Sequence, residues 1–489
     1  MTTTEAPTGP ADKPAFGTKL AFGIGAIANG VKDNGLAYFL LLFYSQVAGL
    51  DSRLVGLALT LALVIDALID PVIGYWSDNF RSRWGRRHPF MYAAAVPVAL
   101  AYFLLWSPPK GLEQQALFVY LLGVLVTIRI LFSLYEIPSN SLAPEITRDY
   151  DQRSSLQAFR YYFAWTGGNA ASVLMFGLLF PLFVTPSFHN GQFNPAAYRV
   201  YGIISATLIF LAIMASSLGT HSQIKHLQAP PPKRDMSVRL IFREILETLW
   251  NKSFAALFLS SIFGSIASGL SASMAFLLYA YFWKFTSAQA SMVTSGVFIS
   301  AIIGATLAPW ISKTLGKKKG AIIVGLIAFL GSPLPITLRL LGVLPPAGAA
   351  VNFWLVFFNT VFDVGLIICF QILSTAMMAD LVEQAEVRTG RRSEGMFFAA
   401  SAFINKIVSG AGIIIASFIL AAAGLARGAD PSTVSTATVL KMGLLYAPTI
   451  VSLWMIMLAI MSTYSINRED HEANLRTLAE VRAKEGDGV

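Results

Sequence analysis

The sequence predicts an all-α polytopic membrane protein with twelve transmembrane helices. Hydrophobic residues make up 55% of its 489 residues and charged residues only 13%, about half the share that is usual in soluble domains. Apolar windows of about 20 residues, long enough to cross a bilayer, recur along the whole chain. The net charge of +9 does not indicate a nucleic-acid partner, because Lys and Arg gather in alternate short loops.

Hydropathy places the predicted spans in order along the chain. Several of them exceed 25 residues, so we expect tilted or extended helices. The spans are 18–47, 53–78, 89–107, 114–143, 154–184, 198–219, 252–283, 288–312, 320–340, 350–380, 395–424 and 437–465.

The basic residues of the loops predict the orientation of these spans, since cytosolic loops are rich in Lys and Arg. The opposite loops carry about one positive charge each, so both termini are predicted to be cytosolic. We expect an integral plasma-membrane protein, with the bacterial inner membrane as the favoured location. The basic loops hold Arg81, Arg83, Arg86 and Arg87 after the second span, Lys313 and Lys317 to Lys319 after the eighth, and Arg388, Arg391 and Arg392 after the tenth.

A polar, Pro-rich segment divides the chain into two halves of six spans. A weak internal repeat supports the division, because "GYWSDNFRSRWGRRHP" follows span two and "ISKTLGKKKG" follows span eight. Two six-helix bundles of this kind are the major facilitator arrangement. The predicted parts are a cytosolic tail (1–17), an N-terminal bundle (18–219), a cytosolic central loop (220–251), a C-terminal bundle (252–466) and a cytosolic tail (467–489).

Charged residues inside the predicted spans need an explanation, because each costs at least about 2.5–3.5 kcal/mol near the bilayer centre. A single acid and base in the membrane could be explained as an ion pair that helps the helices to pack. This number of acids and bases favours a hydrated central site that binds a cation. The residues are Lys32 and Asp33 in span one, Asp66 and Asp70 in span two, Arg129, Ser133 and Glu136 in span four, Arg160 in span five, Asn359 and Asp363 in span ten, and Lys406 in span eleven.

The pair Asp66 and Asp70 is the strongest candidate for that cation site. Their i,i+4 spacing places both carboxylates on one face of a helix. Carboxylate and hydroxyl oxygens suit a small hard cation such as Na⁺, and Ser133 and Glu136 on another span would complete the ligand shell. Two nearby acids also disfavour joint ionisation, so the pair would alternatively hold a proton.

At these residues the chain resembles the glycoside–pentoside–hexuronide:cation symporters, typified by melibiose permease. The stretch "DALIDPVIG" followed by "RSRWGRRHPF" carries the resemblance most specifically. It extends over most of the chain through "KD" at 32–33, "YEIPSNSLAPEIT" at 135–147, "FRYYFA" at 159–164, "MADLVEQAE" at 378–386 and Lys406.

The resemblance implies a role for each matching residue. In that family the two span-two acids and a span-four hydroxyl bind Na⁺, Li⁺ or H⁺, which implies Asp66, Asp70 and Ser133 as cation ligands. It implies further that substrate hydroxyls are bound by Asp33, Glu136 and Arg160, with Lys32 near them and Lys406 close to the cation site.

Three positions depart from the family pattern. Asn140 and Gln371 stand where sugar permeases usually have aromatic residues, so the substrate-binding side chains differ there. Leu63 replaces a common arginine before the first span-two acid. We hypothesise that Arg129 supplies the missing positive charge from a neighbouring helix, with Lys406 as a second source.

The lost aromatic residues leave two substrate classes open. The retained Lys32, Asp33 and Glu136 favour a small polyhydroxylated substrate such as a sugar or glycoside. The related Na⁺-dependent lysophosphatidylcholine symporters share the span-two acids, the span-five arginine and the span-eleven lysine, and use a more apolar site. A lysophospholipid is therefore the alternative substrate.

The loop after span two resembles the gating loop of major facilitators. Asp78, Arg83, Arg86 and Arg87 match its charged positions. The arginines alone would also follow from ordinary cytosolic loop charge. At the matching end of the other half we expect the partner acids of a cytosolic latch, Asp380 and Glu383.

Other classes of protein lack the residues that they would need. An enzyme would need a nucleophile–base pair or a metal cluster, and the five histidines are predicted in loops and tails, away from the acids. A channel would need a continuous polar stripe, whereas these charges gather at mid-membrane depth. We therefore predict a monomeric symporter that works by alternating access among membrane lipids, with no cofactor besides its coupling ion.

Overall fold

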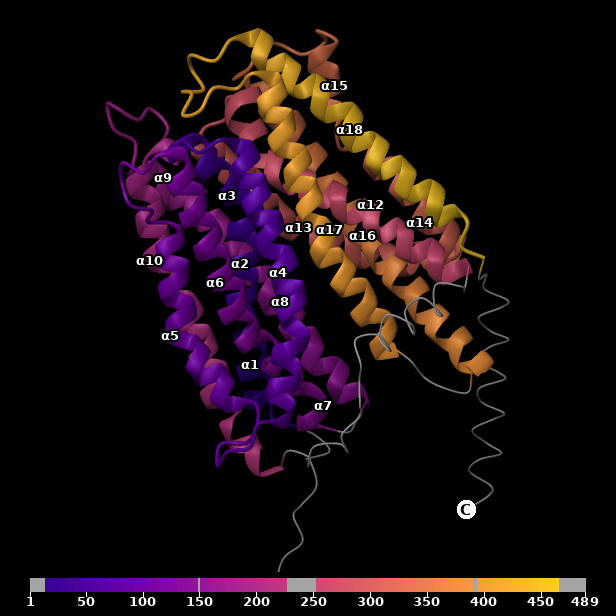
Figure 1. Cartoon of the computed structure of the whole chain (residues 1–489). Helices are drawn as coiled ribbons and strands as arrows, with labels where there is room; N and C mark the ends of the chain where they lie inside the picture. Colours follow the sequence, from indigo (N-terminus) through magenta and orange to yellow (C-terminus); the bar gives the residue numbers. More distant parts are fainter. Residues whose placement is uncertain (1–13, 148–149, 227–251, 390–393, 466–489) are drawn as a thin grey trace, which may run out of the picture.

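The computed structural model of the chain describes residues 14–147, 150–226, 252–389 and 394–465. Figure 1 shows two helical bundles side by side, one from indigo to magenta and one from pink to yellow. We call them the first bundle, α1 to α10, and the second bundle, α12 to α18. The predicted all-helical, two-bundle fold is confirmed.

Each predicted span of the first half forms a helix or a run of consecutive helical segments. The first span is built from five segments with two π-helical turns, η1 and η2. The elements are α1 (Phe16–Ile24), α2 (Ala26–Asn34), η1 (Gly35–Phe39), α3 (Leu40–Leu42), η2 (Phe43–Val47), α4 (Ser52–Asn79), α5 (His88–Leu105), α6 (Gln114–Asn140), α7 (Ala143–Ile146), α8 (Tyr150–Leu174), η3 (Met175–Leu179), α9 (Phe180–Leu182), η4 (Gly191–Phe193), α10 (Pro195–Gly219) and η5 (His221–His226).

The second bundle repeats this plan with one broken helix. The predicted span 320–340 is interrupted at Ser332 and Pro333, where Pro333 and Pro335 together remove two backbone N–H donors within three residues. The elements are α12 (Lys252–Leu277), η6 (Leu278–Phe282), α13 (Ser287–Leu315), α14 (Lys317–Gly331), α15 (Leu334–Leu340), α16 (Ala350–Thr389), α17 (Glu394–Ala423) and α18 (Thr436–Ser462).

Side-chain caps explain where several of these helices begin. The Asp51 carboxylate accepts a hydrogen bond from the Arg53 N–H at the start of α4. Thr286 and Gln289 form a reciprocal capping box at the start of α13. Such caps satisfy the backbone donors that the first helical turn leaves unpaired.

One prediction about the histidines is wrong. His88 is not in a loop but is the first residue of α5, fully buried, with its Nε2 3.0 Å from Thr220 Oγ1. The polar neighbours Thr220 and His221 directly follow α10, and no local pattern in the sequence indicates their contact with His88.

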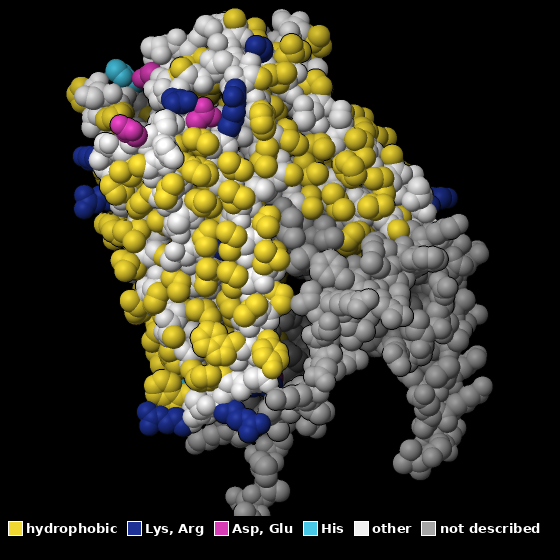
Figure 2. All heavy atoms as spheres, viewed as in Figure 1, with side chains coloured by type: hydrophobic (Ala, Val, Ile, Leu, Met, Phe, Trp, Pro, Cys, Tyr) yellow, Lys and Arg dark blue, Asp and Glu magenta, His cyan; other side chains and the backbone are white. Residues whose placement is uncertain are grey.

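In the described part of the chain, ten helices are long and apolar enough to cross a membrane. Figure 2 shows hydrophobic side chains over the middle of the first bundle and Lys and Arg near its ends. Large side chains such as Leu100, Leu178 and Leu211 are more than half exposed on this surface. Apolar exposure on this scale would drive a soluble protein to associate and suits contact with lipid.

The two bundles touch at one end and diverge toward the other (Figure 1). At the end where they touch, the Ser52 hydroxyl on α4 donates to the Ser417 carbonyl on α17 (3.1 Å). Small residues allow this approach, since a Cβ added to Gly56 would lie 2.8 Å from Ser417 Oγ. Farther along α4, Leu68 and Tyr75 are about two-thirds exposed. We call the diverging end the arginine-loop end, after the α4–α5 loop (80–87).

Candidate functional site

The two acids of α4 converge on one hydroxyl of α6. Ser133 Oγ lies 3.0 Å from Asp66 Oδ1 and 2.6 Å from Asp70 Oδ1. Asp66 is 1% exposed and Ser133 is 3% exposed. A hydroxyl has one hydrogen to donate, so Ser133 donates to one carboxylate at a time. Three oxygens this close favour an added proton or cation among them.

Arg129 is the positive charge that the structure places beside this pair. Its Nη1 lies 3.4 Å from Asp66 Oδ2, and the side chain is buried one helical turn before Ser133. The structure therefore brings Arg129 to the acid pair, as the replacement of an arginine by Leu63 led us to expect.

Pro71 lies directly after the acid pair, inside α4. Because proline has no N–H, the Ala67 carbonyl one turn earlier lacks its usual helical donor. That carbonyl is a further oxygen close in sequence to both acids.

A second cluster joins α2 to α6. Lys32 is 4% exposed, and its Nζ lies 3.1 Å from Asp33 Oδ1 and 3.5 Å from Glu136 Oε2. The Asn29 amide donates to Glu136 Oε1 (2.9 Å). Lys32 Nζ also lies 4.1 Å from the centre of the Phe132 ring, a favourable cation–π distance.

The two clusters form one charged network because α6 contributes to both. Arg129 and Ser133 face the acids of α4, whereas the described contacts of Glu136 go to Asn29 and Lys32 of α2. The charge of Lys32 also interacts with Arg129 and Asp66. We expected Glu136 both among the cation ligands and in the substrate site. Its described contacts are those of the second cluster.

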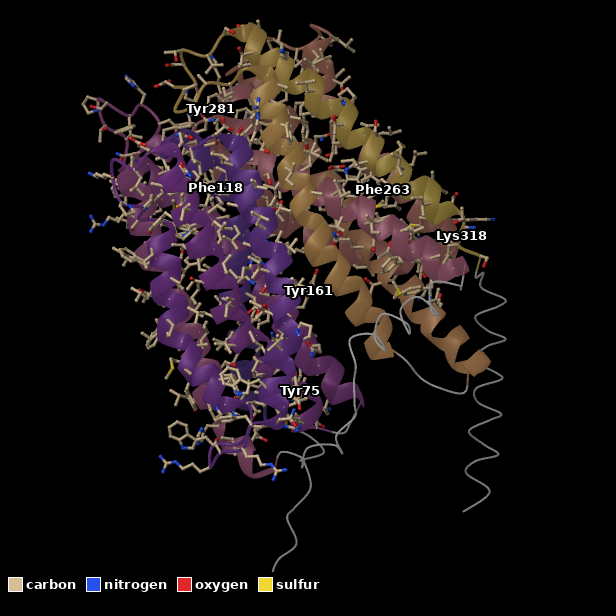
Figure 3. All side chains as sticks on the ribbon, viewed as in Figure 1. Tyr75, Phe118, Tyr161, Phe263, Tyr281 and Lys318 are labelled. Atoms are coloured by element: carbon tan, nitrogen blue, oxygen red, sulfur yellow. The ribbon has the colours of Figure 1, made fainter. Side chains whose placement is uncertain are left out.

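Arg160 of α8 provides a buried guanidinium near this network. It is 6% exposed, its Nη1 donates to Ser139 Oγ at 2.8 Å, and its charged end lies 5.1 Å from the centre of the Phe22 ring. The next residue, Tyr161, is 70% exposed and lies on the side of the first bundle that faces α17 (Figure 3).

The two positions that lost an aromatic residue are accessible. Asn140 ends α6, and Gln371 lies in α16 of the second bundle; both side chains are exposed. The structure does not join them to the Lys32 cluster by any described contact.

The expected gating residues make their described contacts within their own bundles. Arg86 Nη2 lies 2.7 Å from Glu145 Oε1, and Arg87 contacts both Glu145 Oε1 (3.1 Å) and Asp78 Oδ1 (2.5 Å). Arg83 packs over the ring of Trp84 at 5.3 Å.

In the second bundle the corresponding pair joins α14 to α16. Lys317 Nζ lies 2.5 Å from Asp380 Oδ1. Each bundle therefore has its own ion pairs at the arginine-loop end, where the bundles diverge. The side chains of Glu383 and Lys406 lie outside the described residues, so their predicted roles are not placed.

Three contributors to these clusters were not predicted: Ser139 accepts a hydrogen bond from Arg160, Phe132 packs against Lys32, and Glu145 pairs with two arginines. Asn29, a polar residue of the first span, donates a hydrogen bond to Glu136. The i,i+3 spacing of Asn29 to Lys32 and of Glu136 to Ser139 was a usable signal. Nothing local links Glu145 to the arginines about sixty residues before it.

One protein-family model matches almost the whole chain. Residues 21–468 match the family model described as "MFS/sugar transport protein". The inner membrane symporter YicJ of Escherichia coli is 25% identical, over 83% of this chain and 82% of the relative.

Two other likenesses bear on substrate and fold. The sphingosine-1-phosphate transporter MFSD2B of Mus musculus is 25% identical, over 94% of this chain and 91% of the relative. Among solved structures, a variant of the nucleoside transporter NupG superposes with a TM-score of 0.62 at 13% identity, covering 91% of this chain and 99% of that one. This likeness concerns the fold alone.

Proposed function

The chain belongs to the MFS/sugar transport protein family, and from that premise we propose that it is a cation-coupled symporter for a small polyhydroxylated substrate. It is a membrane transport protein of a symporter family that carries glycosides and sugars, and not an enzyme. The coupling ion that we propose is Na⁺, with H⁺ or Li⁺ as alternatives, and the direction is import by alternating access.

The observation that carries this proposal is the convergence of Asp66, Asp70 and Ser133. The two carboxylates and the hydroxyl offer hard oxygen ligands at the centre of a membrane span. A cation that binds there cancels the repulsion between the acids, and it competes with Arg129 for Asp66. Binding of the ion would thereby alter the charge network on α6.

The Lys32 cluster supports the substrate assignment. Hydroxyl groups are both donors and acceptors, so they match a site that holds an ammonium beside two carboxylates. The exposed Asp33 carboxylate and the part-exposed Glu136 carboxylate carry acceptor oxygens, and the Arg160 guanidinium is an additional donor. Ion and substrate would then be coupled reciprocally through α6 and Lys32.

The paired charges at the arginine-loop end support a gate. We propose that this end faces the cytosol and that the described form is open on that side. On closing, Arg83, Arg86 and Arg87 would approach Asp380 and Glu383 of the second bundle, exchanging partners with Asp78, Glu145 and Lys317. Both termini would be cytosolic, and the protein would act as a monomer.

A lysophospholipid-like substrate is the second candidate. It is favoured by the likeness to a sphingosine-1-phosphate transporter and by Asn140 and Gln371 at positions where aromatic residues would stack on a sugar ring. A phosphate-bearing lipid would use Arg160 and Lys32 as charge partners rather than hydroxyl partners.

The test uses the full chain in liposomes with imposed Na⁺ or H⁺ gradients. Substrates are screened first by thermal shift with glycosides and lysolipids, each with and without Na⁺. Asp66→Asn should abolish the cation-dependent part of uptake, because one carboxylate of the pair is gone. Asp430→Asn, in an exposed loop, is the matched control and should behave as wild type.

Full Na⁺- or H⁺-driven accumulation by the Asp66→Asn protein would overturn the proposed cation site. Stabilisation by lysolipids alone, with no response to any glycoside, would replace the first substrate candidate with the second.

A further inference from the structure

Besides the Asp66–Asp70 pair of the first bundle, one buried acid lies at mid-membrane depth in the second bundle. Asp363 is close to the centre of the apolar span Ala350–Met378 of α16 and is only 7% exposed. Its Oδ1 atom is buried and has no hydrogen-bond partner among the described residues. The proposed transport cycle at Asp66 and Asp70 makes no use of this group.

The surroundings of Asp363 are polar and built around the break between α14 and α15. The Ser332 side chain, in the break, interacts with the carboxyl group. Asn359, one turn earlier on α16, donates its amide to the Gly331 carbonyl at 3.3 Å, which is exposed by the break. Tyr446 of α18 is close enough to interact electrostatically with Asp363.

The basic groups on the helices around Asp363 are directed elsewhere in the described structure. Arg339 of α15 lies against the rings of Phe282 and Trp283, at 4.3 and 5.4 Å. Lys317 of α14 is paired with Asp380. The remaining lysines of α13, α14 and α18 are Lys313 in the last turn of α13, Lys318 and Lys319 at the start of α14, and the exposed Lys441.

The titratable neighbours of Asp363 among the described residues are tyrosines, which are neutral at physiological pH. Tyr446 is the one beside it, and Tyr279 of η6 is next to Tyr446. A carboxylate in such a place would carry an uncompensated charge at the cost expected for a charge near the bilayer centre, at least about 2.5–3.5 kcal/mol. A neutral carboxylic acid avoids that cost and can both donate and accept hydrogen bonds.

We propose that Asp363 is a proton-binding site of the second bundle, separate from the acid pair of the first. The carboxylate takes one proton from bulk water and becomes a carboxylic acid, with no other bond formed or broken. A proton suits this site better than a metal ion, because a hard cation needs several oxygen ligands and the described neighbours Ser332, Asn359 and Tyr446 add no second carboxylate.

Infrared spectroscopy of the full chain in lipid nanodiscs tests the proposal directly, since a protonated carboxyl group has a C=O stretch distinct from that of a carboxylate. At neutral pH the wild-type spectrum should contain a buried protonated-carboxyl band. Asp363→Asn should remove that band, whereas Asp430→Asn, an exposed loop acid, should leave it intact. Ser332→Ala should shift the band, because it replaces the hydroxyl beside the carboxyl group with a hydrogen atom, and this variant reports even if Asp363→Asn does not fold.

Two results would overturn the assignment. One is a band that persists unchanged in both Asp363→Asn and Ser332→Ala. The other is a band that Na⁺ abolishes at constant pH, which would mean that a metal ion displaces the proton. Retention of the band in Asp66→Asn separates this site from the acid pair, and since no transport is measured, the result stands apart from the test of the proposed function.

Discussion

The two bundles share one architecture but differ in the surroundings of the charged residues within the membrane. In the first bundle, α2, α4 and α6 bring Lys32, Asp66, Arg129 and Glu136 into a connected network of ion pairs and hydrogen bonds. In the second, Asp363 lies beside neutral groups only, among the described residues. The same helical frame thus holds a connected charge network, where we propose that a cation binds, and a separate buried acid, where we propose that a proton binds.

The difference has a physical origin in what each helix offers its neighbours. A buried ion pair survives when extra hydrogen bonds satisfy both partners, and Asn29 and Ser133 give that support in the first bundle. The Phe132 ring adds a cation–π contact to Lys32. The second bundle has the Ser332 hydroxyl and the Asn359 amide near the α14–α15 break, and such neutral polar groups suit the neutral acid that we propose. We therefore expect substitutions of charged residues in the first bundle to have larger effects than those in the second.

The largest expected effect follows from Lys32→Ala. The variant leaves Asp33 and Glu136 without the buried ammonium between them, and because both carboxylates reach water the cost in stability should stay below the ~3–5 kcal/mol of a fully buried pair. Uptake should fall roughly 100-fold or more, measured in liposomes, while Lys441→Ala on the exposed face of α18 serves as control. Lys32→Ala combined with Glu136→Gln should recover thermal stability without recovering uptake; uptake within a few-fold of wild type in Lys32→Ala would contradict the role of Lys32.

An intermediate effect is expected at the arginine-loop end, where the bundles can be compared directly. Glu145→Gln removes the carboxylate that joins Arg86 and buried Arg87, so the free energy of unfolding should fall by about 3 kcal/mol. Lys317→Met should cost less, about 1 kcal/mol, because that side chain is 30% exposed and water screens its pair with Asp380. Denaturant titration of both variants in detergent measures this, and equal losses would show that the bundles do not differ at this end.

The smallest expected effect concerns the ion pair that joins the bundles at the opposite end. Arg427 Nη2 lies 2.7 Å from Asp51 Oδ2. Partial burial alone would raise the pKa of Asp51, and hydrogen bonds from the Arg53 N–H and the Arg427 guanidinium outweigh it, so the pKa lies below its usual value. A lowered pKa stabilises the contact above the ordinary pKa of aspartate, about 4, and the contribution is lost as pH falls through the lowered pKa.

Hydrogen exchange along α4 and α17 measures that contact. Exchange at residues 52–60 should stay constant from about pH 8 down to pH 5 after correction for intrinsic rates, and rise only in more acidic solution. Arg427→Gln should raise it slightly between pH 8 and pH 5, less than tenfold, as for other exposed pairs, and the difference should disappear in more acidic solution. Loss of protection between pH 8 and 5 would point to a different titrating group.

Much of this protein could be predicted from its sequence. Hydropathy located the spans, and α4, α10 and α12 begin within three residues of the predicted starts. Helical spacing put Asp66 with Asp70, and Arg129 with Ser133, on common faces, and the structure brings all four together. Pro333 was a possible signal for the helix break at Ser332 and Pro333. The break was not predicted, because many membrane helices tolerate proline in their interior.

What only the tertiary structure decided is which of these faces meet. The sequence by itself determined the membrane spans and the depth of each charge, since both depend on local composition and on a rise of about 1.5 Å per residue. The partners of Glu136, Arg87, His88 and Asp363 come from helices distant in the chain. Their pairing depends on how each helix is rotated and packed against its neighbours, which no local pattern encodes.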